Sequence, residues 1–436
     1  MRTHRLGHSG LLGLCALLAG GLLVIAPAYG APTVRLNLWG GFPEIGPFYE
    51  RMAADYSRAN PNVEITVLTH PLRDFERKLA ATIPADTAAD ILEISTYAMQ
   101  RFIEAGLIPP NPSAQDAFVR SKTFPDAMKF INTYKGQTYG VPFFQGRQIM
   151  FWNIKMFQEA GLRRAPQTWD EVIEYCQKLT KKDATGNITR AGIGLRLFGG
   201  GSGVGEKWWF WLYPAGGTII EARPGGKYRA GYTNQAGRDA LKLYVDLVHK
   251  YHCDDPTLKR DAEAFALEQA AMFTRESWVI GFLRSNNPGL LYTSAPLPRF
   301  RRAGTIINPV NLYVTRSTKN ADVAWDFVNF IMRPPNQQLL LDMVGWMPAR
   351  QDVDYKEQIR KSPQFKAFFE APEGFEFYWY LPIGPFDEIL TKLAARLERA
   401  FADKSLVDNP AGIARVIEEA GRETNEILRR EGLLSE

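Results

Sequence analysis

The sequence predicts an α/β protein made of two lobes joined by strands, and three observations support this prediction. Strand and helix patterns alternate through residues 34–105. The chain has 436 residues, 45% of them hydrophobic, which exceeds what one hydrophobic core normally supports. No low-complexity linker divides the chain. We therefore expect two lobes between which the chain passes more than once.

An apolar segment near the start of the sequence predicts an exported protein. Arg2 and Arg5 precede the uncharged run from Leu11 to Ala26, and small residues follow this run. This order is typical of a signal peptide with its cleavage site. The run is also shorter than the roughly 20 residues that a membrane-spanning helix needs. We expect residues 1–30 to be a cleavable signal peptide.

Charge and cysteine content exclude some classes of protein and leave one question open. Removal of the signal peptide takes away two of the 52 Lys and Arg, so 50 remain against 47 Asp and Glu. This mild excess contains no basic block and gives no reason to expect a nucleic-acid partner. Cys176 and Cys253 form one disulfide or remain two buried thiols, and the sequence alone does not decide between these states.

The amino-terminal part predicts a parallel sheet. Its elements are strands over residues 34–39, 63–68 and 90–94 and helices over residues 48–59, 74–83 and 99–105. Strands and helices that alternate at this spacing favour parallel strands with right-handed crossovers. Ligands of such sheets bind at the carboxyl ends of the strands. Trp39 and Phe42 at the end of the first strand, and Tyr97 after the third, are therefore candidate binding residues.

Residues 134–172 combine a turn, a short apolar run, a strand and two helices. The turn is Lys135-Gly136-Gln137, and the apolar run ends at Pro142-Phe143-Phe144. A strand is predicted over residues 148–152, and Gly161 closes the helix that follows. Thr168 begins a second helix.

The rest of the chain continues the mixed pattern. Predicted strands cover residues 191–197, 278–282 and 306–314, and predicted helices cover residues 235–251, 265–273 and 318–332. Residues 387–430 are mostly helical in pattern. We expect this tail to pack against the second lobe.

Several segments together resemble one protein family. Residues 134–172 are similar to the first crossover between lobes in bacterial extracellular solute-binding proteins, the sugar-binding family of ABC importers that includes maltose-binding proteins. Asn60-Pro61-Asn62-Val63 resembles the family's approach to its second strand, and residues 102–109 its segment after the third strand. Ala270-Ala271-Met272-Phe273 with Trp278 resembles the segment that ends in a binding aromatic residue. The common order of these segments makes the resemblance specific.

The resemblance implies two Rossmann-like α/β lobes joined by hinge strands, the periplasmic binding protein type II fold, with a ligand cleft between the lobes. The amino-terminal lobe is expected to comprise residues 31–145 and 308–346, and the carboxy-terminal lobe residues 146–307 and 347–436. We expect a periplasmic monomer without a cofactor that captures a sugar or oligosaccharide, closes by hinge motion and delivers its ligand to ABC importer permease subunits at the inner membrane.

Sugar chemistry explains which residue types are expected in the cleft. Aromatic rings stack on the C–H faces of a pyranose, while charged and amide groups bind its hydroxyls. The family brings an acid and aromatics from the second lobe, which implies roles for Glu206, Trp208 and Trp209. Glu206 has an ordinary alternative as a solvated carboxylate at a helix start. Trp278 matches the stacking aromatic of the family.

Three further candidates follow from where the chain is expected to cross between the lobes. Gln145 and Arg147 lie at the first crossing, and Trp346 lies at the third. Arg147 has the alternative of pairing with an acid at the hinge.

Catalytic and metal-binding interpretations are weaker. Gly200 and Gly205 are spaced as in a phosphate-binding loop, but Glu206 occupies the position of its essential lysine. His249 and His252 lie near a helix end, where cations are ordinary. Two alternatives stay open: a binding protein for glycerol phosphate or another anionic polyol, favoured if Arg147, Arg196 or Arg275 lies in the cleft, and a secreted glycoside hydrolase.

Overall fold

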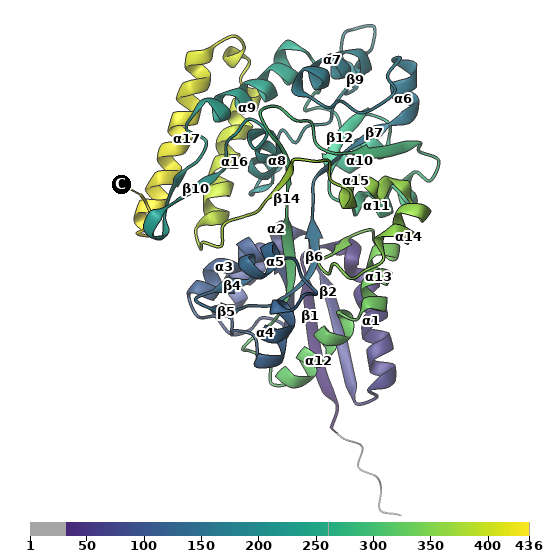
Figure 1. Ribbon diagram of the computed structural model, residues 1–436, viewed down its shortest axis with the longest axis vertical. Helices are drawn as coiled ribbons and strands as arrows, with labels where there is room; N and C mark the ends of the chain where they lie inside the picture. Colours follow the sequence, from purple (N-terminus) through teal and green to yellow (C-terminus); the bar gives the residue numbers. More distant parts are fainter. Residues whose placement is uncertain (1–31, 260, 436) are drawn as a thin grey trace, which may run out of the picture.

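The computed structural model describes residues 32–259 and 261–435 and contains two α/β lobes (Figure 1). The predicted fold class, two α/β lobes joined by connecting strands, is confirmed. The predicted signal peptide lies outside the described residues. In Figure 1 the lower lobe contains β1 and β2, the first strands of the described chain, and helices from its end cover one side of the upper lobe.

The sheet of the first lobe has the strand order β16-β6-β15-β3-β1-β2. Strands β1 and β2 are parallel, as are β1 and β3, while β15 and β16 run antiparallel to β6. The parallel strands predicted from the first hundred residues are confirmed. The strands are β1 (Val34–Gly40), β2 (Val63–Thr69), β3 (Ile91–Ser95), β6 (Val141–Gly146), β15 (Asn308–Val314) and β16 (Met347–Pro348).

The core of the first lobe lies between this sheet and its helices. Strand β3 is buried along its whole length, which fits its central place in the sheet. The helix predicted before Asn60-Pro61 is confirmed and buries Phe48, Tyr49 and Met52 against the sheet. The helices of this lobe are α1 (Gly46–Ala59), α2 (Leu72–Thr82), α3 (Thr96–Glu104), α4 (Ser113–Arg120), α5 (Asp126–Ile131), α12 (Ala321–Ile331) and α13 (Pro334–Met343).

The second lobe has a smaller antiparallel sheet and more helix. Its strand order is β12-β7-β13, formed by β12 (Met272–Arg275), β7 (Ile149–Asn153) and β13 (Tyr292–Ala295). The tail packs on this lobe as predicted, with α16 against α8 and α17 against α9. The helices are α6 (Ile154–Glu159), α7 (Trp169–Leu179), α8 (Gly203–Leu212), α9 (Gln235–Val245), α10 (Asp261–Ala266), α11 (Val279–Asn286), α14 (Tyr355–Lys361), α15 (Lys366–Phe369), α16 (Phe386–Ala402) and α17 (Pro410–Arg430).

Among the described residues, the chain passes between the two sheets at three places. The first connection leads from β6 to β7, and the second leads from β14 (Ala303–Ile306) into β15. The third follows β16 and leads to α14. Figure 1 shows β6 and β14 running between the lower and the upper lobe. The cavity described below lies beside these connections.

Two predicted strands of the second lobe are wrong. Residues 191–197 pair only through isolated bridges, at Ala191 with Ala270 and at Gly194 with Phe273. Gly192 instead brings this segment against α7, where an added Cβ would lie 2.1 Å from the carbonyl oxygen of Cys176. Residues 278–282 belong to helix α11, because a short buried apolar run does not by itself distinguish strand from helix.

Two predicted helices end earlier than expected. The helix predicted over residues 265–273 stops at Ala266, and the chain continues into β12. The one predicted over residues 235–251 is α-helical to Val245, after which residues 246–250 form a π-helical turn.

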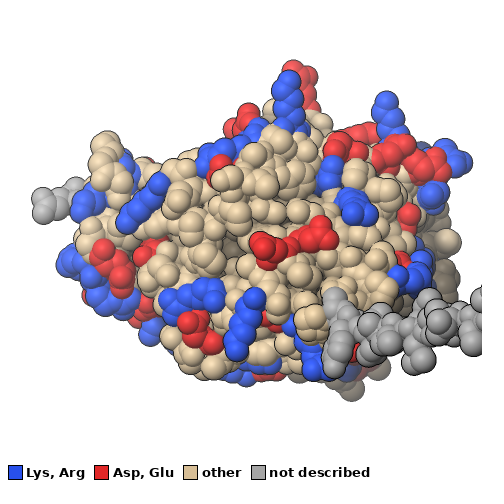
Figure 2. Space-filling model, turned by 90° about the horizontal axis from the view of Figure 1, so that it is seen from below, with Lys and Arg blue, Asp and Glu red and all other residues tan. Residues whose placement is uncertain are grey.

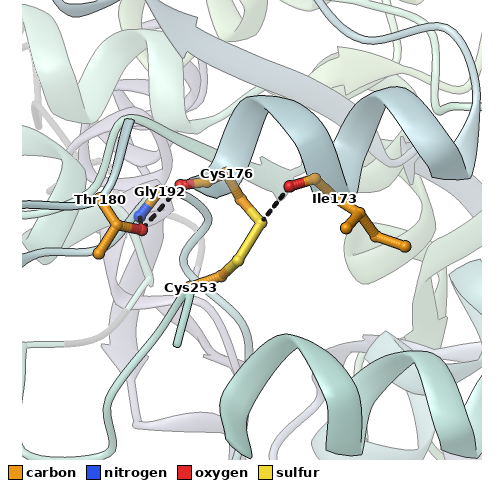
Figure 3. Close-up of a disulfide and its surroundings, with 5 residues drawn as sticks. All are labelled: Ile173, Cys176, Thr180, Gly192 and Cys253. Atoms are coloured by element: carbon orange, nitrogen blue, oxygen red, sulfur yellow. Dashed lines mark hydrogen bonds between the residues drawn. A yellow bond between two sulfur atoms is a disulfide. The ribbon is translucent and has the colours of Figure 1, made fainter. Parts of the chain in front are cut away.

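Cys176 and Cys253 form a disulfide, which decides the question that the sequence left open (Figure 3). The bond joins α7 to the segment that follows the π-helical turn. Both side chains are fully buried. The amide of Gly192 donates to the carbonyl of Cys253 over 2.9 Å, so the bond also fixes the irregular segment over residues 191–197.

The surface carries both signs of charge in close mixture. On the face shown in Figure 2, Lys and Arg lie beside Asp and Glu. Within residues 32–259 and 261–435, no helix combines the length and the apolar character needed to cross a membrane.

Loss of the disulfide is expected to destabilise the protein. The bonded cysteines are 77 positions apart, and a bond that closes such a loop contributes roughly 3–5 kcal/mol to stability. The double variant Cys176→Ala, Cys253→Ala should lose that much free energy of unfolding in a urea titration. Detection of two free thiols in the unfolded, unreduced wild-type protein would contradict the bond.

Candidate functional site

A cavity of about 370 Å³ lies between the two lobes, at the carboxyl ends of β1 and β3. Its volume falls within the range of about 300–1,000 Å³ that is typical of small-molecule sites. Both lobes contribute to its walls. The lining side chains that matter below are Phe42, Glu44, Arg73, Tyr97, Gln148, Arg196, Glu206, Lys207, Arg275, Glu276, Trp278, Asn308 and Trp346.

Aromatic rings line the cavity from both sides. On the first lobe, Phe42 packs edge-to-face against Trp346, with their ring centroids 5.7 Å apart. Tyr97, at the start of α3, adds a buried ring to the same wall. On the second lobe, Trp278 stands half-buried at the start of α11. A ligand between the lobes would therefore meet apolar ring faces on both sides.

A polar network centred on Glu276 fixes the wall of the second lobe. Its carboxylate accepts hydrogen bonds from the indole of Trp278 over 3.2 Å and from the side-chain amide of Gln148. Arg275 lies 3.1 Å from the same carboxylate. The ammonium of Lys207 donates to Oε1 of Gln148 over 2.7 Å and lies 3.8 Å from Glu276. These contacts hold Trp278 in one orientation.

The charges in this network depend on one another. Burial raises the pKa of Glu276, but Lys207 and Arg275 outweigh that effect and lower it to about 2. Burial lowers the pKa of Lys207 to about 8, although Glu276 opposes this shift. Glu276 is thus an anion at neutral pH, and Lys207 is mostly a cation. Each charge is stabilised chiefly by the other.

Two further carboxylates of the cavity have raised pKa values, in contrast to Glu276. Burial raises the pKa of Glu44, which accepts a hydrogen bond from the indole of Trp346 over 3.0 Å. Burial and the nearby Glu276 raise the pKa of Glu206. The Tyr380 hydroxyl interacts with the Glu206 carboxylate. Glu206 also lines the cavity, where its carboxylate has further acceptor capacity for a ligand hydroxyl.

The structure brings half of the predicted site residues to the cavity. These are Phe42, Tyr97, Glu206, Trp278 and Trp346. They come from the loop after β1, from the start of α3, from α8, from the start of α11 and from the segment before β16. Only the fold places these distant parts of the sequence together.

Trp208 and Trp209 lie in the core of the second lobe, contrary to the prediction that they face the cleft. Trp208 packs against Tyr232, and Trp209 against Tyr378 and Phe386. Both indoles are almost completely buried. In an α-helix the side chains two positions apart point in nearly opposite directions. Glu206 and Lys207 on α8 both line the cavity, so Trp208 and Trp209, which lie two positions after each of them, face the core.

Trp39, Gln145 and Arg147 also lie away from the cavity lining. The ammonium of Lys78 lies over the Trp39 ring, 3.5 Å from the ring centroid. Gln145 donates to the carbonyl of Pro348 over 3.1 Å and accepts from Arg147. Arg147 donates to the carbonyl of Phe368 over 2.9 Å, and burial lowers its pKa to about 10. The latter two residues therefore tie the connecting segments together.

Sequence reasoning missed most of the charged lining residues. Glu44 lies two positions after Phe42, and Glu276 lies two positions before Trp278. Proximity to a predicted aromatic residue was thus a usable signal. The same signal applied to Lys207, which lies between Glu206 and Trp208. Arg73 had no such signal, because its approach to the cavity depends on how α2 and α8 meet across the cleft.

His249 and Cys253, near the end of the π-helical turn, have structural partners. A ring nitrogen of His249 lies 2.8 Å from the carbonyl oxygen of Phe401, and Cys253 is in the disulfide. In the part of the chain that the structure describes, no group of His, Cys, Asp or Glu is arranged to hold a metal ion.

A second cavity of about 320 Å³ adjoins the first inside the second lobe. The two share Arg196 and Lys207 as lining residues. Its other walls come from residues 193–199, from Trp211 and Tyr244, and from the start of α10.

Comparison with known proteins identifies a family. A family model described as "Bacterial extracellular solute-binding protein" matches residues 51–367. A binding protein of Brucella abortus is 23% identical over 359 residues, which cover 78% of this chain and 82% of the relative. A maltotriose-binding protein of Pyrococcus abyssi is 26% identical over 340 residues, or 74% of this chain and 68% of the relative.

Solved structures share the fold. An ABC transporter solute-binding protein of Thermotoga lettingae, bound with α-D-tagatose, superposes with a TM-score of 0.78 at 20% identity, covering 91% of this chain and all of the other. The GacH receptor of Streptomyces glaucescens, solved unliganded and with acarbose, has a TM-score of 0.77 at 18% identity, with 92% and 99% covered.

The low pKa of Glu276 predicts a specific pH dependence of stability. A carboxyl with a folded pKa of about 2 and an ordinary unfolded value of 4.5 stabilises the fold above pH 4.5, and this stabilisation is lost as the pH falls toward 2. Glu276→Gln should lower the free energy of unfolding by roughly 1–3 kcal/mol at pH 7. The deficit should shrink as the pH falls from 5 to 2.

Urea titrations at several pH values measure this difference. Glu174→Gln is the matched control, because Glu174 forms an exposed ion pair with Lys178 and such pairs contribute little. A deficit for Glu276→Gln that stays constant with pH would contradict the proposed ionisation.

Proposed function

The chain belongs to the bacterial extracellular solute-binding protein family, and we propose that it captures a sugar or oligosaccharide in the periplasm for an ABC importer. The observation that carries this proposal is the chemistry of the interlobe cavity. Aromatic rings from both lobes suit the C–H faces of a pyranose, and charged and amide groups around them suit its hydroxyls. Relatives named as maltotriose-binding and lactose-binding proteins support the same ligand class.

Each lining group has a role in this proposal. Trp278 stacks on a sugar ring from the second lobe, and Phe42 with Trp346 covers the opposite face. Glu206 accepts hydrogen bonds from sugar hydroxyls. Asn308, on the second connection between the lobes, offers an amide to the rim of the ring.

Capture works through hinge closure in this proposal. The proposed lobes are residues 31–145 with 308–346 and residues 146–307 with 347–436, and the connections between them act as the hinge. A ligand that touches both lobes stabilises the closed arrangement more than the open one, which is how a ligand shifts such an equilibrium. The importer permease at the inner membrane then recognises the closed form of the binding protein, which acts as a monomer.

A thermal-shift screen tests ligand capture. Sugars that bind should raise the melting temperature, because a ligand at 100 times its Kd adds about 2.7 kcal/mol to stability. Trp278→Ala should weaken binding about tenfold while the variant stays folded. Trp39→Ala is the matched control, since this half-buried indole lies outside the cavity, and its affinity should match the wild type.

Two outcomes would contradict the proposal. One is a broad panel of mono- and oligosaccharides that leaves the melting temperature unchanged. The other is release of shorter sugars from a glycan incubated with the protein, which would indicate a glycoside hydrolase instead.

A further inference from the structure

Arg196 stands where the interlobe cavity meets the cavity inside the second lobe. It follows directly after Leu195 in the irregular segment over residues 191–197, and its side chain lines both cavities. The side chain is half-buried, so it is neither part of the core nor on the open surface. A group bound in either cavity would lie next to its guanidinium.

Arg196 differs from the other cations of the site in having no partner. Arg73 is 2.6 Å from Glu76, and Arg275 is 2.8 Å from Asp261. The ammonium of Lys207 donates a hydrogen bond to Gln148. Within the described residues, no hydrogen bond or ion pair to a carboxylate is formed by Arg196.

The lack of a partner has a physical cost. Burial lowers the pKa of Arg196, and the nearby positive charge of Arg275 adds to this effect. An arginine does not escape the cost by losing its proton, because its pKa lies too far above neutral. A buried charge is normally paired or hydrogen-bonded. An unpaired guanidinium that faces a cavity therefore indicates that its partner is an anion from outside the chain, bound in that cavity.

The carboxylates nearest to Arg196 are engaged with other residues. Asp261 forms an ion pair with Arg275. The Glu206 carboxylate, whose pKa is raised by burial and by Glu276, interacts with the Tyr380 hydroxyl. Both still attract the guanidinium at longer range, but neither forms an ion pair with it. Five N–H donors in a planar fork thus remain available, and this geometry suits the two oxygens of a carboxylate or phosphate.

The glycine-rich loop before α8 explains how Arg196 is positioned. A Cβ at Gly203 would lie 2.8 Å from the guanidinium carbon of Arg196, so glycine at this position lets the guanidinium lie directly against the helix start. Gly201 makes similar room for Arg73, which reaches the loop from the first lobe. The amino end of α8, with its partial positive charge, lies at the same place.

We propose that the ligand is an acidic sugar, whose carboxylate or phosphate is bound by Arg196 at the junction of the two cavities. This inference rests on the proposed capture of sugars and specifies the class of sugar. The sugar ring occupies the interlobe cavity between the aromatic walls. The acidic substituent points toward the second lobe and pairs with the guanidinium, and Lys207 adds positive charge beside it.

Matched sets of ligands test this assignment. Each set contains a neutral mono- or disaccharide, its uronic acid and its 6-phosphate, and binding is measured by thermal shift and calorimetry on the mature protein. At least one acidic member should bind roughly 10- to 100-fold more tightly than its neutral counterpart. Preference for the uronic acid or for the phosphate then identifies which anion the site takes.

The variant Arg196→Gln separates a binding role from a structural one. It should remove the preference for the acidic sugar and change the affinity for the neutral counterpart less than about threefold. The melting temperature of the ligand-free variant should equal or exceed that of the wild type, because the substitution removes an unpaired, half-buried charge. Arg58→Gln, on an exposed side chain at the far end of α1, is the control and should change neither value.

The outcomes distinguish this inference from the proposed function. Neutral sugars that bind as tightly as their acidic counterparts would overturn the inference and leave sugar capture intact. A ligand-free Arg196→Gln variant that melts well below the wild type, with the acidic preference retained, would assign Arg196 to the fold instead. Failure of every sugar to bind would contradict the proposed function, and the inference with it.

Discussion

The connections between the lobes are the constraint on which the rest of the structure depends. Strand β6 pairs with both β15 and β16, so the segments that join the lobes form one hydrogen-bonded unit on the side of the first lobe. On the side of the second lobe, the Thr305 hydroxyl accepts from the amide of Gln148 over 3.0 Å and donates to its carbonyl over 2.7 Å. The cavity lies beside this unit. Gln145 and Arg147 tie its segments together, which gives a structural reason for polar side chains at buried positions.

The two walls of the cavity are built differently. The wall of the first lobe contains three aromatic rings, and Glu44 accepts a hydrogen bond from one of them, the indole of Trp346. The wall of the second lobe is mainly charged, and its one cavity-facing indole, Trp278, is held by the ionised Glu276. The charges of Lys207 and Glu276 compensate each other within this wall. Arg196 is the one cation of this wall without a partner among the described residues. In our account its unpaired charge makes the site selective for acidic sugars.

The sequence predicts the fold better than the site, for physical reasons. Strands β1 to β3 follow from local patterns and turn residues, which act within a few positions. Residues 191–197 show that alternating burial does not require strand pairing, because Gly192 packs against α7 instead. On α8, Trp208 and Trp209 are indistinguishable in sequence from cleft residues, since only the direction in which α16 packs decides their face. The partners of Lys207, Gln148 and Glu276, lie far from it in the chain and were not predictable.

The central claim is that a sugar bound between the lobes draws them together. Small-angle X-ray scattering of the mature protein, with and without a saturating ligand from the thermal-shift screen, tests it most directly. Our account predicts a smaller radius of gyration with ligand, and a lesser decrease when the same ligand concentration is added to Trp278→Ala, which is expected to bind about tenfold more weakly. A radius of gyration that stays constant while calorimetry shows the wild-type protein to be saturated would contradict hinge closure.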